Sequence, residues 1–215
     1  MLPIGDDNSQ RRLFPIVTYA LIAINIIVFL LELRGGDAFI YAWSFIPLRF
    51  LSSPIEGLIT LFTSMFLHAG WLHLGGNMLY LLIFGDNVED RFGHFKFLVF
   101  YVLSGLAAGL AQYAVSMFSE YPTLGASGAI AGVLAAYLVL FPGRRVRVLL
   151  AAWIVNLPAL LVIGAWIVIQ LVSGLGTFSD STATGGVAYM AHIGGFVAGL
   201  VLTLFMRNKA RGISF

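Results

Sequence analysis

Two side chains in this sequence could form the reactive pair of a serine hydrolase. Ser127 lies in Gly125-Ala126-Ser127-Gly128, directly before a long apolar run, and His192 lies in a second apolar stretch rich in glycine. A serine hydroxyl is a weak nucleophile that needs an adjacent base, and an imidazole supplies one near neutral pH. These residue types predict nucleophilic catalysis by a Ser127–His192 dyad.

A second polar pair could stabilise the negative charge that develops in such a reaction. His73 and Asn77 are four residues apart, so they share one face of a helix. Together with the backbone N–H of Ser127 they are candidate donors to an oxyanion. We expect no Asp or Glu inside any membrane-spanning segment, which favours a catalytic dyad over a catalytic triad. Asp180 is a remote alternative for the third residue of a triad.

Each of these residues also has a structural interpretation. Serine in a glycine-rich membrane helix is usually a packing residue, and an asparagine there more often joins two helices by a hydrogen bond. An ionisable residue inside a membrane is the stronger signal of function, so the combination favours catalysis. We expect His94 to be solvated and Glu89-Asp90-Arg91 to tie down a cytosolic loop.

The elements that must position these residues lie in a membrane. Sixty per cent of the 215 residues are apolar and ten per cent are charged, against roughly 25% charged residues in soluble domains. The first apolar run follows a charged segment and no cleavage pattern of small residues comes after it, which predicts a retained span. The absence of cysteine excludes disulfides and thiol nucleophiles.

The apolar runs predict an all-α membrane protein with six transmembrane helices. The predicted spans are residues 14–33, 72–84, 95–118, 127–141, 146–171 and 186–206. We expect one catalytic domain, residues 14–206, between a short, polar and flexible cytosolic N-terminus (1–13) and a short basic cytosolic tail (207–215).

The first outer segment, residues 34–70, is too polar to span and too apolar for a solvated loop. It carries apolar residues at helical spacing, which predicts a short helix lying in the membrane interface: Ile55, Leu58, Ile59 and Phe62.

Positive charge predicts the orientation of the spans. One side of the predicted helices carries ten Lys and Arg residues, and the other carries only Arg34 and Arg49. Cytosolic connections hold the excess of positive charge in membrane proteins. We therefore expect both chain termini in the cytosol.

The predicted spans place the polar residues at one depth. Ser127 and His192 each begin a stretch of 15 residues that ends at the cytosolic side of its apolar run. As a helix, 15 residues are about 22 Å long. The hydrocarbon core is about 30 Å thick, so both side chains should lie roughly 8 Å below the outer surface. His73 reaches nearly the same level, which predicts a polar cavity that opens outward.

Glycine pairs predict which helices touch. Gly128 and Gly132 on the fourth span, and Gly195 and Gly199 on the sixth, have the spacing that lets two helix backbones approach closely. The contact would bring His192 within reach of Ser127, and Gly199→Val should disturb it.

In combination these motifs resemble the rhomboid family of intramembrane serine proteases, in its six-span prokaryotic form. Four matches occur in family order: His68-(x4)-His73-(x3)-Asn77, Glu89-(x)-Arg91-(x)-Gly93, Gly125-Ala126-Ser127-Gly128 and Ala191-His192-(x2)-Gly195-(x3)-Gly199. The resemblance implies an oxyanion site formed by His73, Asn77, Ala126 and Ser127, and it gives structural roles near the site to His68, Gly125, Gly128, Gly195 and Gly199.

The resemblance also implies a substrate and a location. It predicts hydrolysis of a peptide bond near the outward end of the transmembrane helix of a single-span protein, in a prokaryotic plasma membrane. It implies no cofactor, no metal and no nucleic acid, and it leaves the oligomeric state open.

One departure from the family supports an alternative. Many members carry an aromatic residue four positions after the nucleophile, where this chain has Ala131. The alternative is a catalytically weak, rhomboid-like scaffold that binds membrane helices. A transporter is disfavoured because we recognise neither an acidic ion-coupling residue nor repeated halves in the sequence. A zinc site is disfavoured because His68 and His73 are five residues apart, whereas a zinc-binding helix has its two histidines four residues apart.

Overall fold

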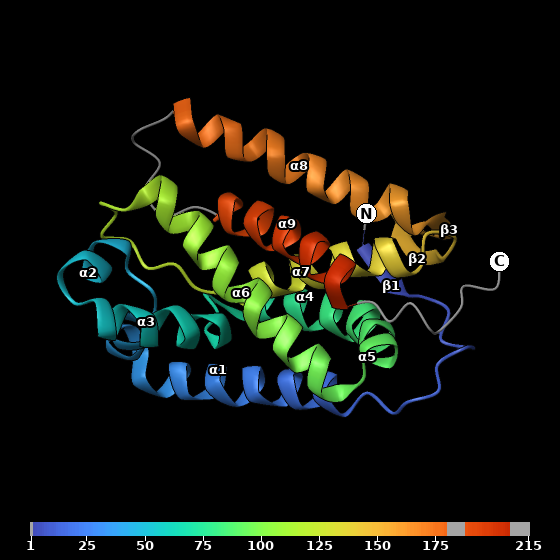
Figure 1. Ribbon diagram of the computed structural model, residues 1–215, viewed down its shortest axis with the longest axis horizontal. Helices are drawn as coiled ribbons and strands as arrows, with labels where there is room; N and C mark the ends of the chain where they lie inside the picture. Colours follow the sequence, from blue (N-terminus) through green and yellow to red (C-terminus); the bar gives the residue numbers. More distant parts are fainter. Residues whose placement is uncertain (1, 180–187, 207–215) are drawn as a thin grey trace.

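The computed structural model describes residues 2–179 and 188–206, which form a bundle of helices with a small β-sheet at one end (Figure 1). The helices are α1 (Ile16–Trp43), α2 (Pro47–Ser52), α3 (Pro54–Thr63), α4 (Trp71–Tyr80), α5 (Asp86–Phe92), α6 (His94–Ser116), α7 (Ser127–Leu140), α8 (Ala159–Ser179) and α9 (Tyr189–Met206). A 3₁₀ turn, η1 (Ser64–Phe66), follows α3, and a π-helical turn, η2 (Leu81–Gly85), joins α4 to α5.

The helices confirm a multi-pass membrane protein. Three described helices, α1, α6 and α9, are long and apolar enough to cross a membrane. A fourth crossing results if the bent pair at residues 54–66 and 71–92, which meet at an angle of 80°, is one broken span. Helices α7 and α8 are apolar but shorter. The count of six spans stays a prediction.

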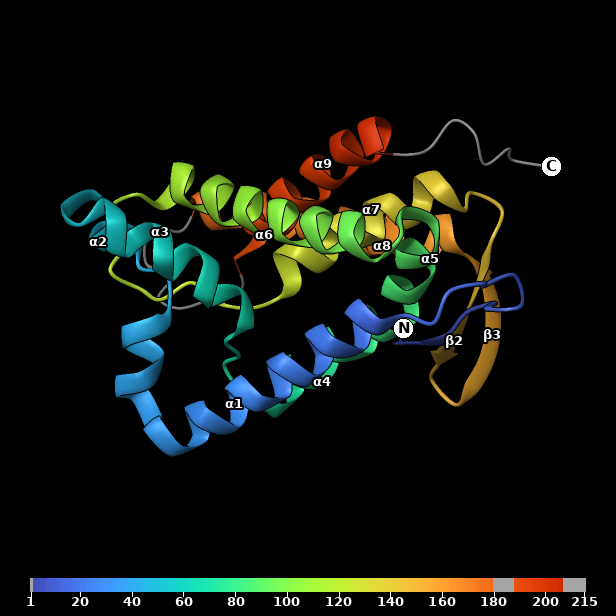
Figure 2. The same ribbon diagram turned by 60° about the horizontal axis from the view of Figure 1, so that its bottom comes forward.

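Helix α1 extends beyond the predicted first span, which ended at Leu33. It continues to Trp43 through a kink at Gly36, whose φ of 59° lies in the left-handed region that favours glycine. Figure 2 shows the chain bending toward α2 at this end of α1. Glu32 lies inside α1, and it also lies inside the predicted span 14–33, so the prediction that no acidic residue lies inside a span is wrong.

Glu32 is tolerated there because its carboxyl group has a hydrogen-bond donor. Its side chain is buried, and the backbone N–H of His68 donates to its two carboxylate oxygens at 3.0 and 3.2 Å. A buried carboxylate without such donors would be strongly unfavourable.

The first outer segment contains two short helices, α2 and α3. The apolar residues predicted to form one face of a helix are exposed together on α3: Ile55, Leu58, Ile59 and Phe62. Thr60 and Ser64 point inward and are buried. The helical spacing is confirmed, and the location of α3 in the membrane interface stays a prediction.

The predicted fifth span, residues 146–171, is wrong in its first half. Strands β2 (Arg145–Leu150) and β3 (Trp153–Pro158) form an antiparallel hairpin there, β1 (Leu2–Gly5) pairs with the other edge of β2, and α8 begins only at Ala159. Arginine and valine alternate at the start of β2, and Val146 and Val148 are fully buried. This period of two is typical of a strand with one buried face.

The N-terminus also differs from its prediction. Residues 1–13 were expected to be flexible, but β1 is part of the sheet. The Tyr137 hydroxyl donates to Asp6 at 2.6 Å, and Arg11 forms an ion pair with Asp86 at 2.5 Å. These contacts hold the N-terminal segment against the end of the bundle. The basic tail at 207–215 lies outside the described residues.

Glu89 fixes the start of α1. Its buried carboxylate accepts the backbone N–H groups of Val17 and Thr18 at 2.9 and 2.8 Å, and the Thr18 hydroxyl at 2.7 Å. An anion is favourable at a helix N-terminus. His94 Nδ1 lies 2.6 Å from the same carboxylate, and the rest of the His94 side chain is exposed, as predicted. These contacts give a structural basis to the predicted role of Glu89 in holding this loop in place.

Helices α6, α7 and α9 pack at the centre of the bundle, and glycines set their separation. A Cβ atom added to Gly195 would overlap the carbonyl oxygen of Gly128, and one added to Gly199 would overlap the backbone of Gly132. Both predicted glycine pairs therefore lie at the contact between α7 and α9.

We predict that Gly199→Ala lowers the melting temperature of the detergent-solubilised protein by several degrees, because overpacking a tight contact costs about 1–3 kcal/mol. The control is Gly164→Ala on α8, where an added Cβ has no neighbouring atom within 4 Å. Equal melting temperatures for the two variants would contradict the packing argument.

Candidate active site

Ser127 and His192 meet where α7 and α9 begin. Ser127 is the first residue of α7 and His192 lies in the first turn of α9. His192 Nε2 is 2.7 Å from Ser127 Oγ, which is hydrogen-bonding distance. The His192 side chain is buried and Ser127 is half-buried. The structure thus brings together the two residues that the sequence pairs as base and nucleophile.

A third side chain, Gln170 on α8, contacts the other nitrogen of the imidazole. His192 Nδ1 is 2.7 Å from Gln170 Oε1, and Gln170 is buried. A carbonyl oxygen can only accept a hydrogen bond, so Nδ1 carries the proton in this pair. The lone pair of Nε2 is then free to accept the Ser127 proton, which is the tautomer that a general base requires.

Trp166, one turn before Gln170, lies beside the same imidazole. The ring centroids of Trp166 and His192 are 5.5 Å apart, with 40° between the planes. Ala131, the position at which the resemblance predicts an aromatic residue, is fully buried and offers no ring. In this chain α8 supplies an aromatic neighbour for His192 from a different helix.

Trp166 and Gln170 were not among the predicted site residues, although the sequence carries a signal for them. Trp166 and Gln170 are four apart, so they lie on one face of α8. A glutamine within an otherwise apolar helix is a candidate for function, because polar side chains in a membrane need partners. Asp180, the remote alternative for the third residue of a catalytic triad, lies outside the described residues.

His73 and Asn77, two of the predicted oxyanion residues, lie on α4, next to the turn that precedes α7. Gly125 has a φ of 128°, and a Cβ added there would lie 2.9 to 3.0 Å from the His73 ring and 3.5 Å from Ser127 Oγ. Glycine at this position therefore lets the His73 ring approach the serine. The Gly125 N–H donates to the Ser64 carbonyl at 2.9 Å, which holds the turn in place.

Two further groups are suited to bind an oxyanion. The Asn77 side-chain nitrogen is buried and has no hydrogen-bond partner among the described residues. Ser127 opens α7, directly after Ala126, so its backbone N–H has no acceptor within the helix. An unused buried donor is unfavourable unless something binds it, and a substrate oxyanion would do so.

His68 packs beneath the site. Its ring is almost fully buried and meets the His73 ring edge to face, with centroids 5.1 Å apart. Its backbone N–H is the donor to Glu32. These contacts favour a structural role in which His68 holds His73 in place.

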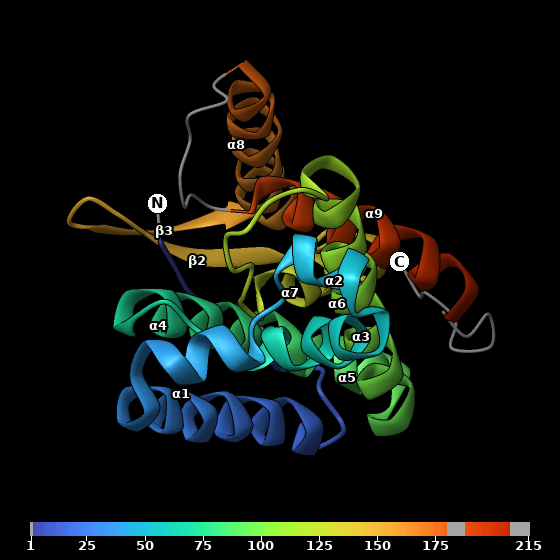
Figure 3. The same cartoon turned by 90° about the vertical axis from the view of Figure 1, so that its left-hand side faces the viewer.

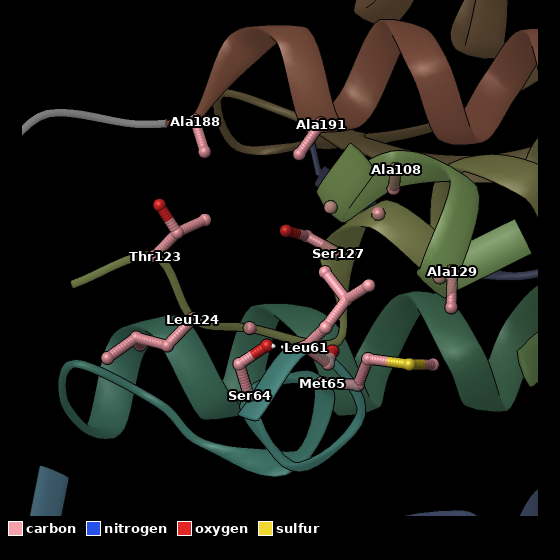
Figure 4. Close-up of a pocket in the computed structure, with 14 residues that line it drawn as sticks. Leu61, Ser64, Met65, Ala108, Thr123, Leu124, Ser127, Ala129, Ala188 and Ala191 are labelled. Carbon is pink, nitrogen blue, oxygen red and sulfur yellow. Dashed lines mark hydrogen bonds between the residues drawn. The ribbon is translucent and has the colours of Figure 1, made fainter. Parts of the chain in front are cut away.

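A cavity of about 30 Å³ borders Ser127. Figure 4 shows the Ser127 hydroxyl pointing into the open space between Thr123 and the start of α9, which Ala188 and Ala191 mark. Most of the lining residues are small, including Gly105, Ala108, Gly109 and Gly128. The space has room for a water molecule or a small side chain.

Comparison with known proteins gives a consistent result. The family model described as the rhomboid domain matches residues 56–209. The chain is 32% identical over 187 residues to "Rhomboid protease GluP" of Bacillus subtilis, an alignment that covers 86% of this chain and 34% of that protein. It is 30% identical over 190 residues to "Rhomboid protein 1, mitochondrial" of Saccharomyces cerevisiae, covering 86% and 51%.

A third relative matches along nearly its whole length. "Putative rhomboid protease YdcA" of Bacillus subtilis is 26% identical over 211 residues, which cover 96% of each protein. By contrast, the chain spans only about a third to a half of the first two relatives.

We predict that Gln170→Leu slows the reaction of Ser127 with a fluorophosphonate probe at least tenfold, because a correctly placed general base contributes on the order of 10²- to 10⁴-fold. Gln170→Glu, which keeps an acceptor for the Nδ1 proton, should recover most of the rate near neutral pH. The control is Ile169→Leu, which changes an exposed neighbour on α8. A wild-type rate in Gln170→Leu would exclude the positioning role.

Proposed function

The chain belongs to the rhomboid family, and from this premise we propose that it is an intramembrane serine endopeptidase in which Ser127 is the nucleophile and His192 the general base. The observation that carries the proposal is the 2.7 Å contact between His192 Nε2 and Ser127 Oγ at the meeting point of α7 and α9. A serine activated by an adjacent imidazole is the arrangement that acyl transfer needs.

The reaction follows from the positions of these groups. Ser127 Oγ attacks the carbonyl carbon of the scissile peptide bond while His192 Nε2 accepts the hydroxyl proton. The carbonyl oxygen becomes an oxyanion, for which the His73 ring, the Asn77 amide and the backbone of Ala126 and Ser127 are the proposed binding groups. His192 then donates its proton to the amine that leaves, and an acyl-enzyme remains on Ser127.

Water completes the cycle through the same residues. His192 Nε2 accepts a proton from a water molecule whose oxygen attacks the acyl carbon, and the proton returns to Ser127 Oγ as the carboxylic acid product departs. Gln170 and Trp166 act on both steps as positioning residues, since they touch the imidazole and not the substrate.

We assign the bundle six crossings: α1, the bent segment from α3 to α5, α6, α7, α8 and α9. The positive residues at one end of this bundle favour a cytosolic location for both termini, in a prokaryotic plasma membrane. We assign residues 14–206 to the catalytic domain. The preceding strand β1 pairs with β2 at the cytosolic end of this domain. In this orientation Ser127 lies toward the outer side, since α7 runs from Ser127 to the positive end.

The proposed substrate is a single-span membrane protein cut near the outward end of its helix. Amides in a regular helix are hydrogen-bonded, so the segment must unwind before Ser127 can reach it. The small cavity beside Ser127 favours a small side chain next to the scissile bond. The scaffold alternative rested on the missing ring at Ala131, and Trp166 now provides a ring beside His192.

Labelling with a fluorophosphonate probe tests the nucleophile. We expect covalent labelling of the wild-type protein and none of Ser127→Ala. The matched control is Ser64→Ala, because Ser64 lines the same cavity but its hydroxyl donates to the Leu61 carbonyl at 3.0 Å. Labelling that survives Ser127→Ala, or disappears in Ser64→Ala, would refute the assignment.

A further inference from the structure

The tip of the β2–β3 hairpin is made only of apolar residues. Figures 2 and 3 show the hairpin extending past the helices, with its loop away from the bundle. The tip comprises Leu149, Leu150, Ala151, Ala152, Trp153 and Ile154. Trp153 is 76% exposed and Ile154 65% exposed. An apolar tip of this size at a free loop is unusual for a segment that faces water.

The turn itself departs from the composition of a water-facing hairpin. Two-residue hairpin turns of type I′ or II′ have a positive φ at their first central residue, which favours Gly, Asn or Asp at that position. Here the turn is Ala151-Ala152, and Ala151 has a φ of 53°. Alanine is present at Ala151 in spite of an unfavourable backbone conformation, so the residue types that usually occupy this position are missing.

The base of the hairpin has the opposite character. Arg147 pairs with Asn156 across the strands, and Arg145 lies two residues away on the same face. Their side chains line a groove with Arg144, Asp6 and Asp7, where three positive groups face two acidic ones. The hairpin thus changes from basic at its base to apolar at its tip.

Neighbouring residues locate the membrane beside this hairpin. Helix α8 continues directly from β3, and its first residues Leu160 and Leu161 are 63% and 59% exposed. With α8 as one of the six proposed crossings, these residues face lipid. Lipid must therefore begin within a few residues of the base, on the side of the sheet where Val146 and Val148 pack against the bundle.

We propose that the β2–β3 tip inserts into the interfacial layer of the bilayer, with Arg145 and Arg147 at the level of the anionic headgroups. Tryptophan is the residue type that favours this layer, and arginines near the membrane surface are attracted to anionic lipid. The surface is continuous with the lipid-facing start of α8, which favours lipid over a protein partner. The hairpin becomes a second membrane contact beside the helical spans.

Site-specific fluorescence can test the location, because the chain contains no cysteine and a single introduced one is labelled uniquely. The test variant is Ala152→Cys at the tip and the matched control is Asn156→Cys at the base, both at exposed positions of the hairpin. Each is labelled with an environment-sensitive fluorophore in nanodiscs of phosphatidylcholine and phosphatidylglycerol, where both membrane faces are open to solutes.

We expect lipid carrying a doxyl group on its acyl chain, below the headgroup, to quench the tip label several-fold more than the base label, and aqueous iodide to show the reverse order. Adding Leu150→Asp and Trp153→Asp to the Ala152→Cys variant should make the tip label accessible to iodide. Retained fluorophosphonate labelling of Ser127 shows that each variant is folded.

Two results would overturn the proposal. Equal iodide quenching at the tip and the base would show that the tip lies in water. Protection of the tip label from both quenchers would show that protein covers it, such as a second copy of the chain pairing along β3.

Discussion

The close backbone contact between α7 and α9 is the constraint on which the site depends. At Gly195 and Gly199 the backbone of α9 lies directly on the backbone of α7, where a Cβ atom has no room. Ser127 precedes this contact by one residue on α7, and His192 precedes it by three on α9. Because backbone, and not flexible side chains, sets the separation of the helices, the distance between the serine oxygen and the imidazole is fixed by the fold.

The orientation of the imidazole depends on a different helix. Gln170 and Trp166 reach His192 from α8, and in the described residues no carboxylate contacts Nδ1. An amide oxygen fixes the tautomer without adding a negative charge inside the membrane, where charge is unfavourable. Helix α8 also continues directly from β3, so a hairpin anchored in the interface would set the depth at which α8 begins and, through it, the height of Gln170.

The sequence predicted those features that repeat at a fixed period or combine rare residue types. The glycine pairs and the Ser127, His73, Asn77 and His192 positions follow from such signals. The β2–β3 hairpin was not predicted, because valine and leucine occur equally well in a buried strand and in a membrane helix. Only the alternation of arginine and valine from Arg145 to Val148 distinguishes the strand from a helix. Glu32 and Gln170 were missed because their partners, His68 and His192, are distant in sequence and come close only in the folded bundle.

In the proposed function, the imidazole of His192 activates Ser127 for peptide hydrolysis inside the membrane. The most direct measurement is the rate at which the protein, reconstituted in liposomes, cuts a single-span substrate that has small residues near the outer end of its helix. We predict cleavage by the wild type and a fall in rate of at least about 100-fold in His192→Ala, the lower end of what a general base contributes. Cleavage at the wild-type rate by a folded His192→Ala protein would contradict it.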